Sequence, residues 1–337
     1  MDHGGNIAAA RAHFGEPQGG WLDLSTGINP DAYPFDESRL AQPVWSALPQ
    51  FDRVATLIEA ARVAYCVPQA ASIVVAPGTQ ALIQVLPRVL MHARTGLPAA
   101  QVAIVGPTYS EHAITWARSG AEVREISSLR AVSSADDIVV AVHPNNPDGR
   151  LFAVEDVVRV QRVLGARGGA LILDEAFADV VPGLSHIDRT GDGGIIVLKS
   201  FGKFYGLAGV RLGFAMADGD VAARLSVELG PWAVSGPAIE IGIEALADRA
   251  WAQRARGEVS ARAARLSTLL VGAGFRLIGS GGLFVLVAHP DARTRHDALC
   301  RLGILTRRFE RYPTWLRFGL PRELDLPRVA AALDTLG

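Results

Sequence analysis

The stretch ALILDEAF at residues 170–177 decides the fold expected for this chain. Its apolar residues follow one another without the polar alternation of a half-exposed strand, and Asp174 and Glu175 come near its end. An unbroken apolar strand is typical of a parallel sheet with both faces covered. A carboxylate that ends such a strand needs a cation or hydrogen-bond donors close by. The stretch therefore predicts a buried strand that ends at a chemical site.

Further apolar runs of the same kind lie on either side of this strand, and helical patterns separate several of them. The runs are SIVVAPG (72–78), QVAIVGP (101–107), DDIVVAVHP (136–144) and GIIVLKS (194–200), and the helical segments include 79–93 and 154–167. This order predicts an α/β fold with a mostly parallel central sheet and helices on both faces. In such sheets ligands gather at the carboxyl ends of the strands.

The two ends of the chain have a different pattern of residues from the middle. Beyond residue 237 the patterns predict a long helical stretch, two strands, a helix, a further strand near TWLRFGL (314–320) and a final helix. They indicate a smaller α+β domain. We expect an N-terminal arm over 1–48 that packs with the small domain, a large α/β domain over 49–237 and a small C-terminal domain over 238–337.

Composition excludes several classes of function. The 337 residues are 49% apolar and 20% charged, with a formal net charge of −1. This is typical of a soluble globular protein and favours neither nucleic acid nor an anionic membrane as a partner. No apolar run is long enough to span a bilayer, and the N-terminus has no signal-peptide pattern. We expect a cytoplasmic protein without a metal site, since Cys66 and Cys300 have no metal-ligand spacing.

Lysine occurs at two positions only, Lys199 and Lys203, both within LKSFGKFYGLAGVRLGF (198–214). A lysine that forms a Schiff base must be uniquely placed and partly desolvated. Ser200 and Arg211 flank Lys203 and can hold a phosphate while the amine reacts nearby. A helix N-terminus with a capping serine and two solvent-exposed lysines would look the same. This stretch alone leaves both interpretations open.

Asp174 likewise has more than one interpretation. A pyridinium nitrogen would stabilise its carboxylate, and the pairing would keep the ring an electron sink. Alternatively, Asp174 caps a following helix, or it binds Mg²⁺ with Glu175 in a phosphohydrolase. A phosphohydrolase would need a GxxxxGK[ST] loop or a second acidic cluster, and the sequence contains neither; GxGxxG is absent too.

Three more strand ends carry polar or aromatic residues. PGTQ (77–80) opens a helix, whose first N–H groups can bind phosphate, although many strand–helix turns look alike. Asn146 in HPNNPDG (143–149) can donate to a phenolic oxygen or simply form a turn. Tyr109 in GPTYSEH (106–112) can stack on a planar ring or fill the core.

Taken together, these motifs resemble a known family. The core motifs are NPDG (146–149), DEAF (174–177) and SFGK (200–203) followed by Arg211. In this order the chain resembles, over nearly its whole length, the fold-type I pyridoxal-phosphate enzymes of the aminotransferase class I/II family. The resemblance implies pyridoxal 5'-phosphate as the cofactor and Lys203 as the lysine that forms the Schiff base.

The resemblance also assigns roles to the other residues of the site. Asp174 would pair with the pyridine nitrogen, Asn146 would bind the ring hydroxyl and Tyr109 would stack on the ring. The cofactor phosphate would be held by Thr79, Ser200 and Arg211, with the backbone of Gly78 and Gln80. Arg317 in WLRFGL matches the family's carboxylate-binding arginine, and Lys199 would have no part in the chemistry.

Two groups in the family share this compact length: histidinol-phosphate aminotransferases and the L-threonine-O-3-phosphate decarboxylases of cobalamin biosynthesis. HGGN (3–6) and LDLSTGINP (22–30) resemble the opening of the decarboxylases. On that resemblance a small phosphorylated amino acid would be bound by His3, Gly5, Asn6, Asn29, Arg307 and Arg317. We prefer Arg307 to Arg308 for the phosphate. An ordinary mobile N-terminal arm is the alternative for the glycine-rich start.

Two departures from the family pattern concern tyrosines. Phe177 stands where relatives commonly have a tyrosine that reaches the ring oxygen, which leaves Asn146 as the main donor. Leu48, in Ala-Leu-Pro, replaces the tyrosine of an R-Y-P motif that reaches the partner subunit's cofactor phosphate. Neither departure removes a catalytic atom, and both speak against a plain histidinol-phosphate aminotransferase. The resemblance also implies a homodimer.

The resemblance therefore implies decarboxylation of L-threonine O-3-phosphate to (R)-1-amino-2-propanol phosphate. The catalytic residues Lys203, Asp174 and Tyr109 would serve transamination equally well, so a histidinol-phosphate aminotransferase, or another of class I/II, remains the alternative. A third possibility is a non-catalytic partner subunit of the cobalamin pathway. Such a protein would be expected to have lost Lys203 or Asp174, and both are present.

Overall fold

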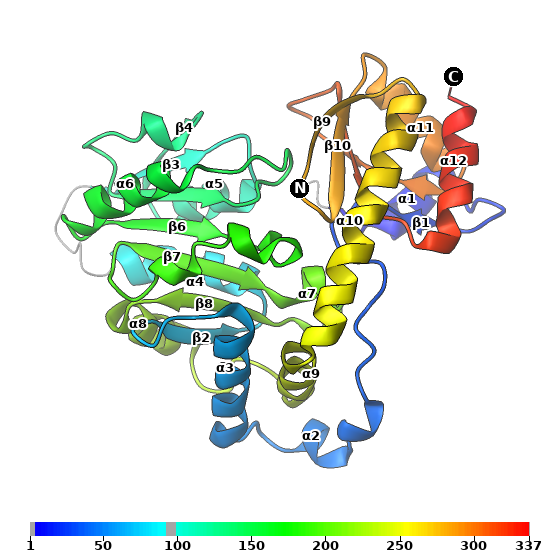
Figure 1. The fold of residues 1–337 in the computed structure, drawn as a ribbon. Helices are drawn as coiled ribbons and strands as arrows, with labels where there is room; N and C mark the ends of the chain where they lie inside the picture. The colour runs from blue at the N-terminus through cyan, green and yellow to red at the C-terminus, as the bar shows by residue number, and fades with distance from the viewer. Residues whose placement is uncertain (1–3, 92–98, 337) are drawn as a thin grey trace. The chain divides into compact units, whose positions relative to one another are not determined.

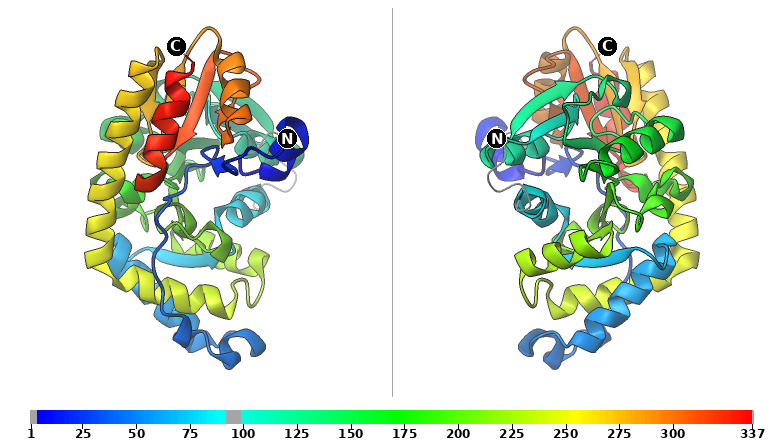
Figure 2. Two further views of the ribbon diagram at one scale, coloured as in Figure 1. Left: turned by 90° about the vertical axis from the view of Figure 1, so that its right-hand side faces the viewer. Right: turned by 90° about the vertical axis from the view of Figure 1, so that its left-hand side faces the viewer.

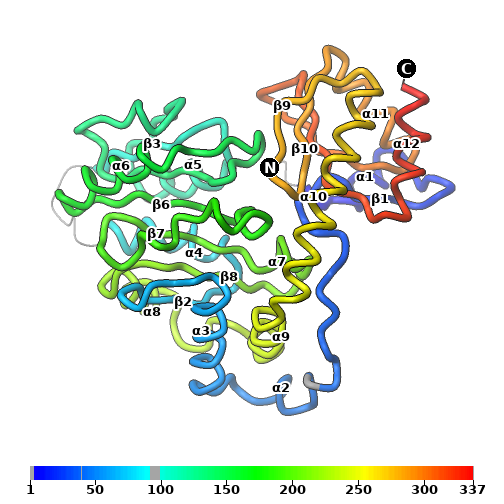
Figure 3. Tube along the Cα trace, in the orientation of Figure 1, coloured from blue at the N-terminus to red at the C-terminus, as the bar shows by residue number. Residues whose placement is uncertain are grey.

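The computed structural model describes residues 4–91 and 99–336, which form two compact units. The larger unit comprises Tyr33–Asn146 and Leu151–Ala252, and the smaller comprises Pro147–Arg150 with the two ends of the chain, Met1–Ala32 and Gln253–Gly337. The trace in Figure 3 shows how the smaller unit combines segments from both ends. The predicted division at residues 48 and 237 stays a prediction about which parts fold independently.

A seven-stranded sheet forms the centre of the larger unit. Its strands, in sheet order, are β2 (Ser72–Ala76), β8 (Gly213–Ala217), β7 (Ile195–Ser200), β6 (Ala170–Asp174), β5 (Ile138–Val142), β3 (Gln101–Val105) and β4 (Glu122–Ile126). From β7 to β4 all neighbours are parallel, whereas β8 is antiparallel to both of its neighbours. The predicted α/β fold with a mostly parallel sheet is therefore confirmed.

Helices cover both faces of this sheet (Figures 1 and 2). One face packs against α4 (Thr79–Met91), α5 (Ser110–Arg118) and α8 (Gly219–Leu229), and the other is covered by α3 (Phe51–Tyr65) and α6 (Val154–Gly165). The short helix α2 (Gln42–Ser46) precedes α3, α7 (Phe201–Phe204) follows β7, and α9 (Gly236–Ala247) packs on α3.

The alternation of side chains along the strands decides which residues meet. Ile172 on β6 and Leu198 on β7 belong to the core under α4, α5 and α8. Since successive side chains of a strand point to opposite faces, Asp174 and Ser200 share that face. Glu175 and Lys199 belong to the opposite face.

The predicted strands of the larger unit are all present, and β4 and β8 are additional. β4 is an edge strand with the sequence EVREI, and most of its side chains are at least partly exposed, so it lacks an apolar run. β8, with the sequence GFAMA, has small residues and lies directly after the lysine motif. Neither sequence carries the strong β-branched signal of the predicted strands.

The smaller unit has the predicted α+β character. Its antiparallel sheet has the order β12 (Arg307–Arg308), β13 (Trp315–Gly319), β10 (Phe284–Ala288) and β9 (Arg276–Ser280), and β1 (Leu22–Asp23) pairs in parallel with β11 (Ile304–Leu305). Its helices are α1 (Ile7–Phe14), α11 (Ala292–Arg301), α12 (Leu326–Asp334) and most of α10 (Arg249–Gly272). None of the helices among the described residues is long and apolar enough to cross a membrane.

The long helical stretch predicted over 238–272 is wrong in one respect: it is two helices. α9 ends at Ala247 and α10 begins at Arg249. The carboxylate of Asp248 accepts a hydrogen bond of 2.8 Å from the backbone N–H of Trp251. Such a contact caps the start of a new helix and explains the break.

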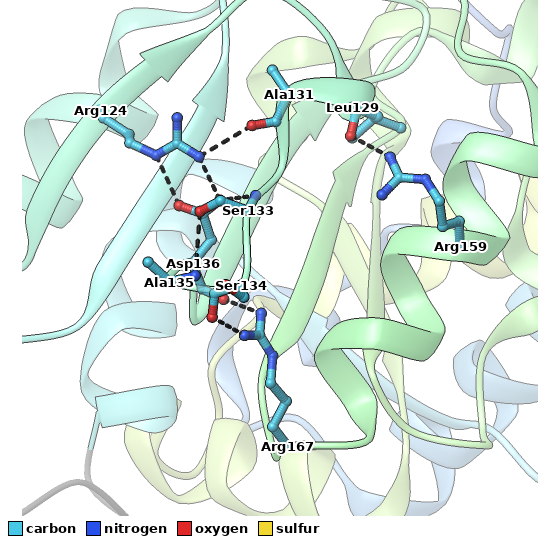
Figure 4. A network of polar contacts seen from close by, with 9 residues as sticks. All are labelled: Arg124, Leu129, Ala131, Ser133, Ser134, Ala135, Asp136, Arg159 and Arg167. Atoms are coloured by element: carbon cyan, nitrogen blue, oxygen red, sulfur yellow. Dashed lines mark hydrogen bonds and ion pairs between the residues drawn. The ribbon is translucent and has the colours of Figure 1, made fainter.

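The connection between β4 and β5 is held by arginines (Figure 4). Arg124 donates to both carboxylate oxygens of Asp136, at 2.8 and 2.5 Å, and the backbone N–H of Ser133 donates to the same carboxylate at 2.7 Å. Burial by itself would raise the pKa of Asp136, but the hydrogen bonds from Arg124 and Ser133 outweigh it and lower that pKa below its ordinary value. Asp136 therefore stabilises the fold in its charged form.

Replacing Asp136 by Asn should lower the free energy of unfolding at pH 7 by about 1.5–3 kcal/mol, the usual contribution of hydrogen bonds to a charged group. Because the folded-state pKa is depressed, this contribution is complete above the ordinary carboxyl pKa of 3.8 and is lost as the pH falls through the folded-state value. Urea unfolding at pH 7 and below pH 4 measures both effects. Equal stability of the two proteins at pH 7 would contradict the assignment.

Candidate active site

The register of the large sheet brings the carboxyl ends of several strands together on one side of the sheet. Asp174, the last residue of β6, lies beside Leu198 of β7, two residues before Ser200. Ser200 is paired with Gly213 on β8, and Gly213 is paired with Ala76 at the end of β2. The residues that follow β2, β6 and β7 are therefore neighbours, although they lie far apart in the sequence.

Asp174 is buried with a histidine against its carboxylate. It is 4% exposed, and its Oδ2 lies 3.0 Å from Nε2 of His112 on α5, which is 2% exposed. Its Oδ1 accepts a hydrogen bond of 3.1 Å from the backbone N–H of Ala176. The carboxylate is thus held in one orientation at the carboxyl end of β6.

Sequence reasoning missed His112, although the GPTYSEH motif contains it. It lies three residues after Tyr109, and residues at this spacing share one face of a helix. In the structure the rings of Tyr109 and His112 meet edge to face, with centroids 6.1 Å apart. The i, i+3 spacing was the available signal.

Tyr109 and Gln80 are also brought together. The Tyr109 hydroxyl donates to Oε1 of Gln80 at 3.1 Å, and Nε2 of Gln80 donates to Glu111 at 3.0 Å. This chain of hydrogen bonds joins the start of α4 to the start of α5. It holds the tyrosine ring, which is partly exposed, in a defined direction.

A close approach of Arg211 to Gly78 shapes the region at the start of α4. Gly78 has φ +83°, and a Cβ added to it would lie 2.7 Å from Nη2 of Arg211. A Cβ on Gly213 would lie 2.7 Å from the backbone nitrogen of Thr79. The two glycines therefore leave room for the Arg211 guanidinium beside the first N–H groups of α4, and both kinds of group bind phosphate.

Asn146 is presented by a fixed turn after β5. Its neighbour Asn145 is fully buried, accepts from the Thr108 hydroxyl at 2.7 Å and donates to the Pro107 carbonyl at 2.9 Å. These bonds tie the turn to the end of β3, so Asn146 lies on the same side of the sheet as the other carboxyl ends of the strands.

The two lysines have different environments. Lys199 is 2% exposed, and its Nζ lies 3.0 Å from Oε2 of Glu175 and 3.2 Å from Oδ1 of Asp179. Burial by itself would lower the pKa of Lys199, but these two carboxylates raise it above its ordinary value. A solvent-exposed Lys199 is therefore excluded. Its amine stays protonated, and a protonated amine is no nucleophile.

Lys203 is the remaining candidate for covalent chemistry. It lies in the one-turn helix α7, directly after β7, and is partly exposed. Its Nζ is 5.9 Å from the centre of the Phe177 ring, which is itself buried. The phenyl ring that replaces the expected tyrosine thus lies beside the lysine amine.

In the smaller unit, Arg307 and Arg317 lie directly opposite each other on β12 and β13. Arg317 is 7% exposed and donates to the backbone carbonyl of Ser25 at 2.9 Å. Burial and, second, the charge of Arg307 lower the pKa of Arg317 to about 9, while Asp23 acts in the opposite direction. Two cations held this close favour an anion beside them.

A cavity of about 460 Å³ in the smaller unit is lined by Gly4, Asn6, Ser25, Arg307 and Arg308 among others. The backbone N–H of Gly5 donates to Oγ of Ser25 at 2.7 Å, and Oδ1 of Asn6 caps α1 by accepting from Ala9 at 3.0 Å. The structure thus brings Gly5, Asn6 and Arg307 together.

Among the described residues, Asn29 and Arg317 are predicted substrate residues that do not line this cavity. Asn29 is 3% exposed, accepts a hydrogen bond from the N–H of Asp31 at 3.2 Å and is not one of the lining residues. His3 lies outside the described residues.

Known proteins resemble the chain over nearly its whole length. It is 43% identical to a threonine-phosphate decarboxylase of Sinorhizobium sp, covering 98% of this chain and 97% of that protein. It is 39% identical to a threonine-phosphate decarboxylase of Pseudomonas aeruginosa, covering 99% and 97%. The histidinol-phosphate aminotransferase structure from Clostridium acetobutylicum superposes with a TM-score of 0.82 at 20% identity, over 94% of this chain and 98% of that one, which shows the fold.

The sequence profile of the family described as aminotransferase class I and II matches residues 42–333. This match confirms the resemblance on which the sequence analysis relied. The chain therefore belongs to the aminotransferase class I and II family.

Proposed function

We propose that this protein is a pyridoxal-phosphate-dependent decarboxylase that converts L-threonine O-3-phosphate into (R)-1-amino-2-propanol phosphate and carbon dioxide, in cobalamin biosynthesis. The observation that carries the proposal is the identity of 43% and 39%, over nearly the whole chain, to two proteins named threonine-phosphate decarboxylase. The opening motifs HGGN and LDLSTGINP favour the same group of enzymes.

The residues at the carboxyl ends of the central strands fit pyridoxal 5'-phosphate. The cofactor needs an anchor for its phosphate and a partner for its ring nitrogen. The start of α4, with the glycine at 78 that admits the Arg211 guanidinium, offers the first. The buried carboxylate of Asp174 offers the second. When bound, the cofactor supplies a sink for the electrons that are released when a bond at the substrate's Cα breaks.

The residues of the larger unit then have distinct tasks. Lys203 would bond the aldehyde carbon of the cofactor, and its amine would later carry a proton to the substrate's Cα. Asp174 would hold a proton at the ring nitrogen, and His112 keeps that carboxylate in place through the 3.0 Å contact. Tyr109 would stack on the ring, and Asn146 would donate to its hydroxyl. The phosphate would be bound by Gly78, Thr79, Gln80, Ser200 and Arg211.

The smaller unit would bind the anionic groups of the substrate. Like charges directly opposite on paired strands are destabilising, so Arg307 and Arg317 gain stability when an anion neutralises them. A substrate with both a phosphate and a carboxylate suits two arginines. Both Arg307 and Arg308 line the cavity, but Arg308 also lies 3.7 Å from Glu310, which supports Arg307 as the phosphate ligand.

We also propose a cytoplasmic homodimer. Three large apolar residues near one another in the sequence are strongly exposed: Trp45 at 64%, Leu48 at 60% and Phe51 at 78%. A cavity of about 440 Å³ next to them is lined by Trp45, Pro49 and residues of α9. Contact with a second copy would remove this apolar surface from water. Leu48 stands where relatives have the tyrosine that reaches across to the partner subunit.

The purified protein with pyridoxal 5'-phosphate should release carbon dioxide from L-threonine O-3-phosphate without any keto acid, because the bond to the carboxylate is the one that breaks. Lys203→Ala should abolish this release, since the amine is needed to engage the cofactor. Conversion of histidinol phosphate that depends on 2-oxoglutarate, without carbon dioxide release, would instead indicate the aminotransferase. Neither activity would favour the non-catalytic subunit.

Neighbouring arginines supply a matched test of the substrate phosphate. Arg307→Met should raise KM for L-threonine O-3-phosphate about 10- to 100-fold, which corresponds to losing hydrogen bonds to a charged group. Arg308→Met should change KM less than about threefold. Both variants should keep the absorption of the bound cofactor. A larger effect of Arg308→Met would move the phosphate to that arginine.

A further inference from the structure

A buried ionic cluster lies on the face of the large sheet opposite to Asp174. It consists of Glu175, Asp179 and Lys199, which are 0%, 5% and 2% exposed. The Lys199 ammonium contacts Oε2 of Glu175 at 3.0 Å and Oδ1 of Asp179 at 3.2 Å. None of these three residues has a part in the proposed chemistry, yet the cluster begins one residue after Asp174.

Glu175 ties a long excursion of the chain back to the sheet. Besides Lys199, Oε2 accepts from the Ser185 hydroxyl at 2.5 Å, and Oε1 accepts from the backbone N–H of His186 at 2.7 Å. Its own N–H donates to the carbonyl of Leu198 at 2.9 Å. One carboxylate therefore anchors both ends of the segment 175–186 to β7.

Lysine at position 199 is unusual for this chain, in which all but two of the 33 lysines and arginines are arginines. The ammonium lies between two carboxylates and 5.4 Å from the centre of the Tyr65 ring. A compact ammonium with three donors suits this enclosed place, whereas a planar guanidinium with five donors does not. The residue type thus follows from the tight packing around the cluster.

The nearby histidines do not replace the lysine charge. His143 and His186 lie with ring centroids 4.9 Å apart, and both are almost fully buried. Burial is the main cause that lowers the pKa of His143 to about 4, and it also lowers the pKa of His186. Both are neutral at pH 7, so neither histidine supplies Glu175 or Asp179 with a positive charge.

We propose that Lys199 is a positioning residue for Asp174. By holding Glu175 and Asp179, Lys199 fixes the backbone that directly follows Asp174 and links it to β7, the strand that leads into Ser200 and Lys203. The direction of the Asp174 carboxylate toward the cofactor's ring nitrogen then depends on a contact made on the other face of the sheet. This inference rests on the proposed function, because the ring nitrogen is that of pyridoxal 5'-phosphate.

Two variants separate the effect of the Lys199 contacts, which link Glu175 and Asp179 to β7, from the effect of the lysine's charge. Lys199→Met removes the ammonium and keeps the length of the side chain. Lys199→Met/Glu175→Gln removes one positive and one negative charge, so the formal charge of the cluster is that of the wild type while the link is lost. Asp136→Asn is the matched control, because it breaks the ion pair of the buried Asp136 with the partly exposed Arg124, near the start of β5 in the same sheet.

The measurements are the visible absorption and circular dichroism of the bound cofactor, the pH dependence of that absorption, the thermal midpoint, and kcat and KM. Both Lys199 variants should keep a cofactor attached to Lys203, lose visible circular dichroism and shift the pH at which the absorption changes. Their kcat should fall about tenfold or more, as expected for a misplaced catalytic group, with KM changed less than about threefold. Asp136→Asn should lower the thermal midpoint and leave the spectra and kcat unchanged.

A lower thermal midpoint with wild-type spectra and kcat in both Lys199 variants would overturn the proposal, because Lys199 would then be structural only. Recovery of the wild-type spectrum in the double variant would overturn it too, because charge rather than the link would matter. If Lys199→Met does not fold, the double variant decides alone. A wild-type protein that lacks the visible band would overturn the proposed function itself, and this inference with it.

Discussion

A carboxylate buried at the end of a central strand is the constraint on which the rest of the site depends. Asp174 is 4% exposed, and an isolated charge there would be costly. The contacts with His112 and the N–H of Ala176 orient it, and the parallel register of β6 and β7 puts it next to the strand that leads to Lys203. In the proposed function, the charged ring nitrogen of the cofactor would give this buried charge a partner.

Two lysines at and just after the end of β7 lie in different environments. Lys199 faces away from the proposed cofactor site, is enclosed by carboxylates and stays protonated. Lys203 follows in a single helical turn, where its amine lies 5.9 Å from the centre of the Phe177 ring. Lys199 is thus held by carboxylates, and Lys203 is the lysine that the proposed function assigns to covalent chemistry. The environment, not the residue type, decides the role.

Much of this architecture was predictable because its signals are local. The apolar runs predicted the central strands. The polar residue that closes each run indicated the side of the sheet where the carboxyl ends of the strands gather. β8 could not be predicted from GFAMA, because its small residues form a strand only between two neighbours that supply the pairing. Asp248 divides α9 from α10 through a capping bond that the helical pattern alone does not contain.

The contacts that hold the catalytic groups were harder to predict, because they join residues far apart in the sequence. His112 and Asp174 are 62 positions apart, and the ion pair of Lys199 with Asp179 needs the segment after β6 to fold back on β7. The resemblance to a known family named the residues that would touch the cofactor. It did not indicate the groups that support them, and the roles of the cofactor residues stay predictions.

The account is tested most directly by locating the lysine that holds the cofactor. Reduction of the loaded protein with borohydride makes the bond between lysine and cofactor permanent, and cleavage after Phe201 separates the two lysines of the chain. Mass spectrometry should find the pyridoxyl group on the peptide that contains Lys203. A pyridoxyl group on Lys199, or on neither lysine, would contradict the account.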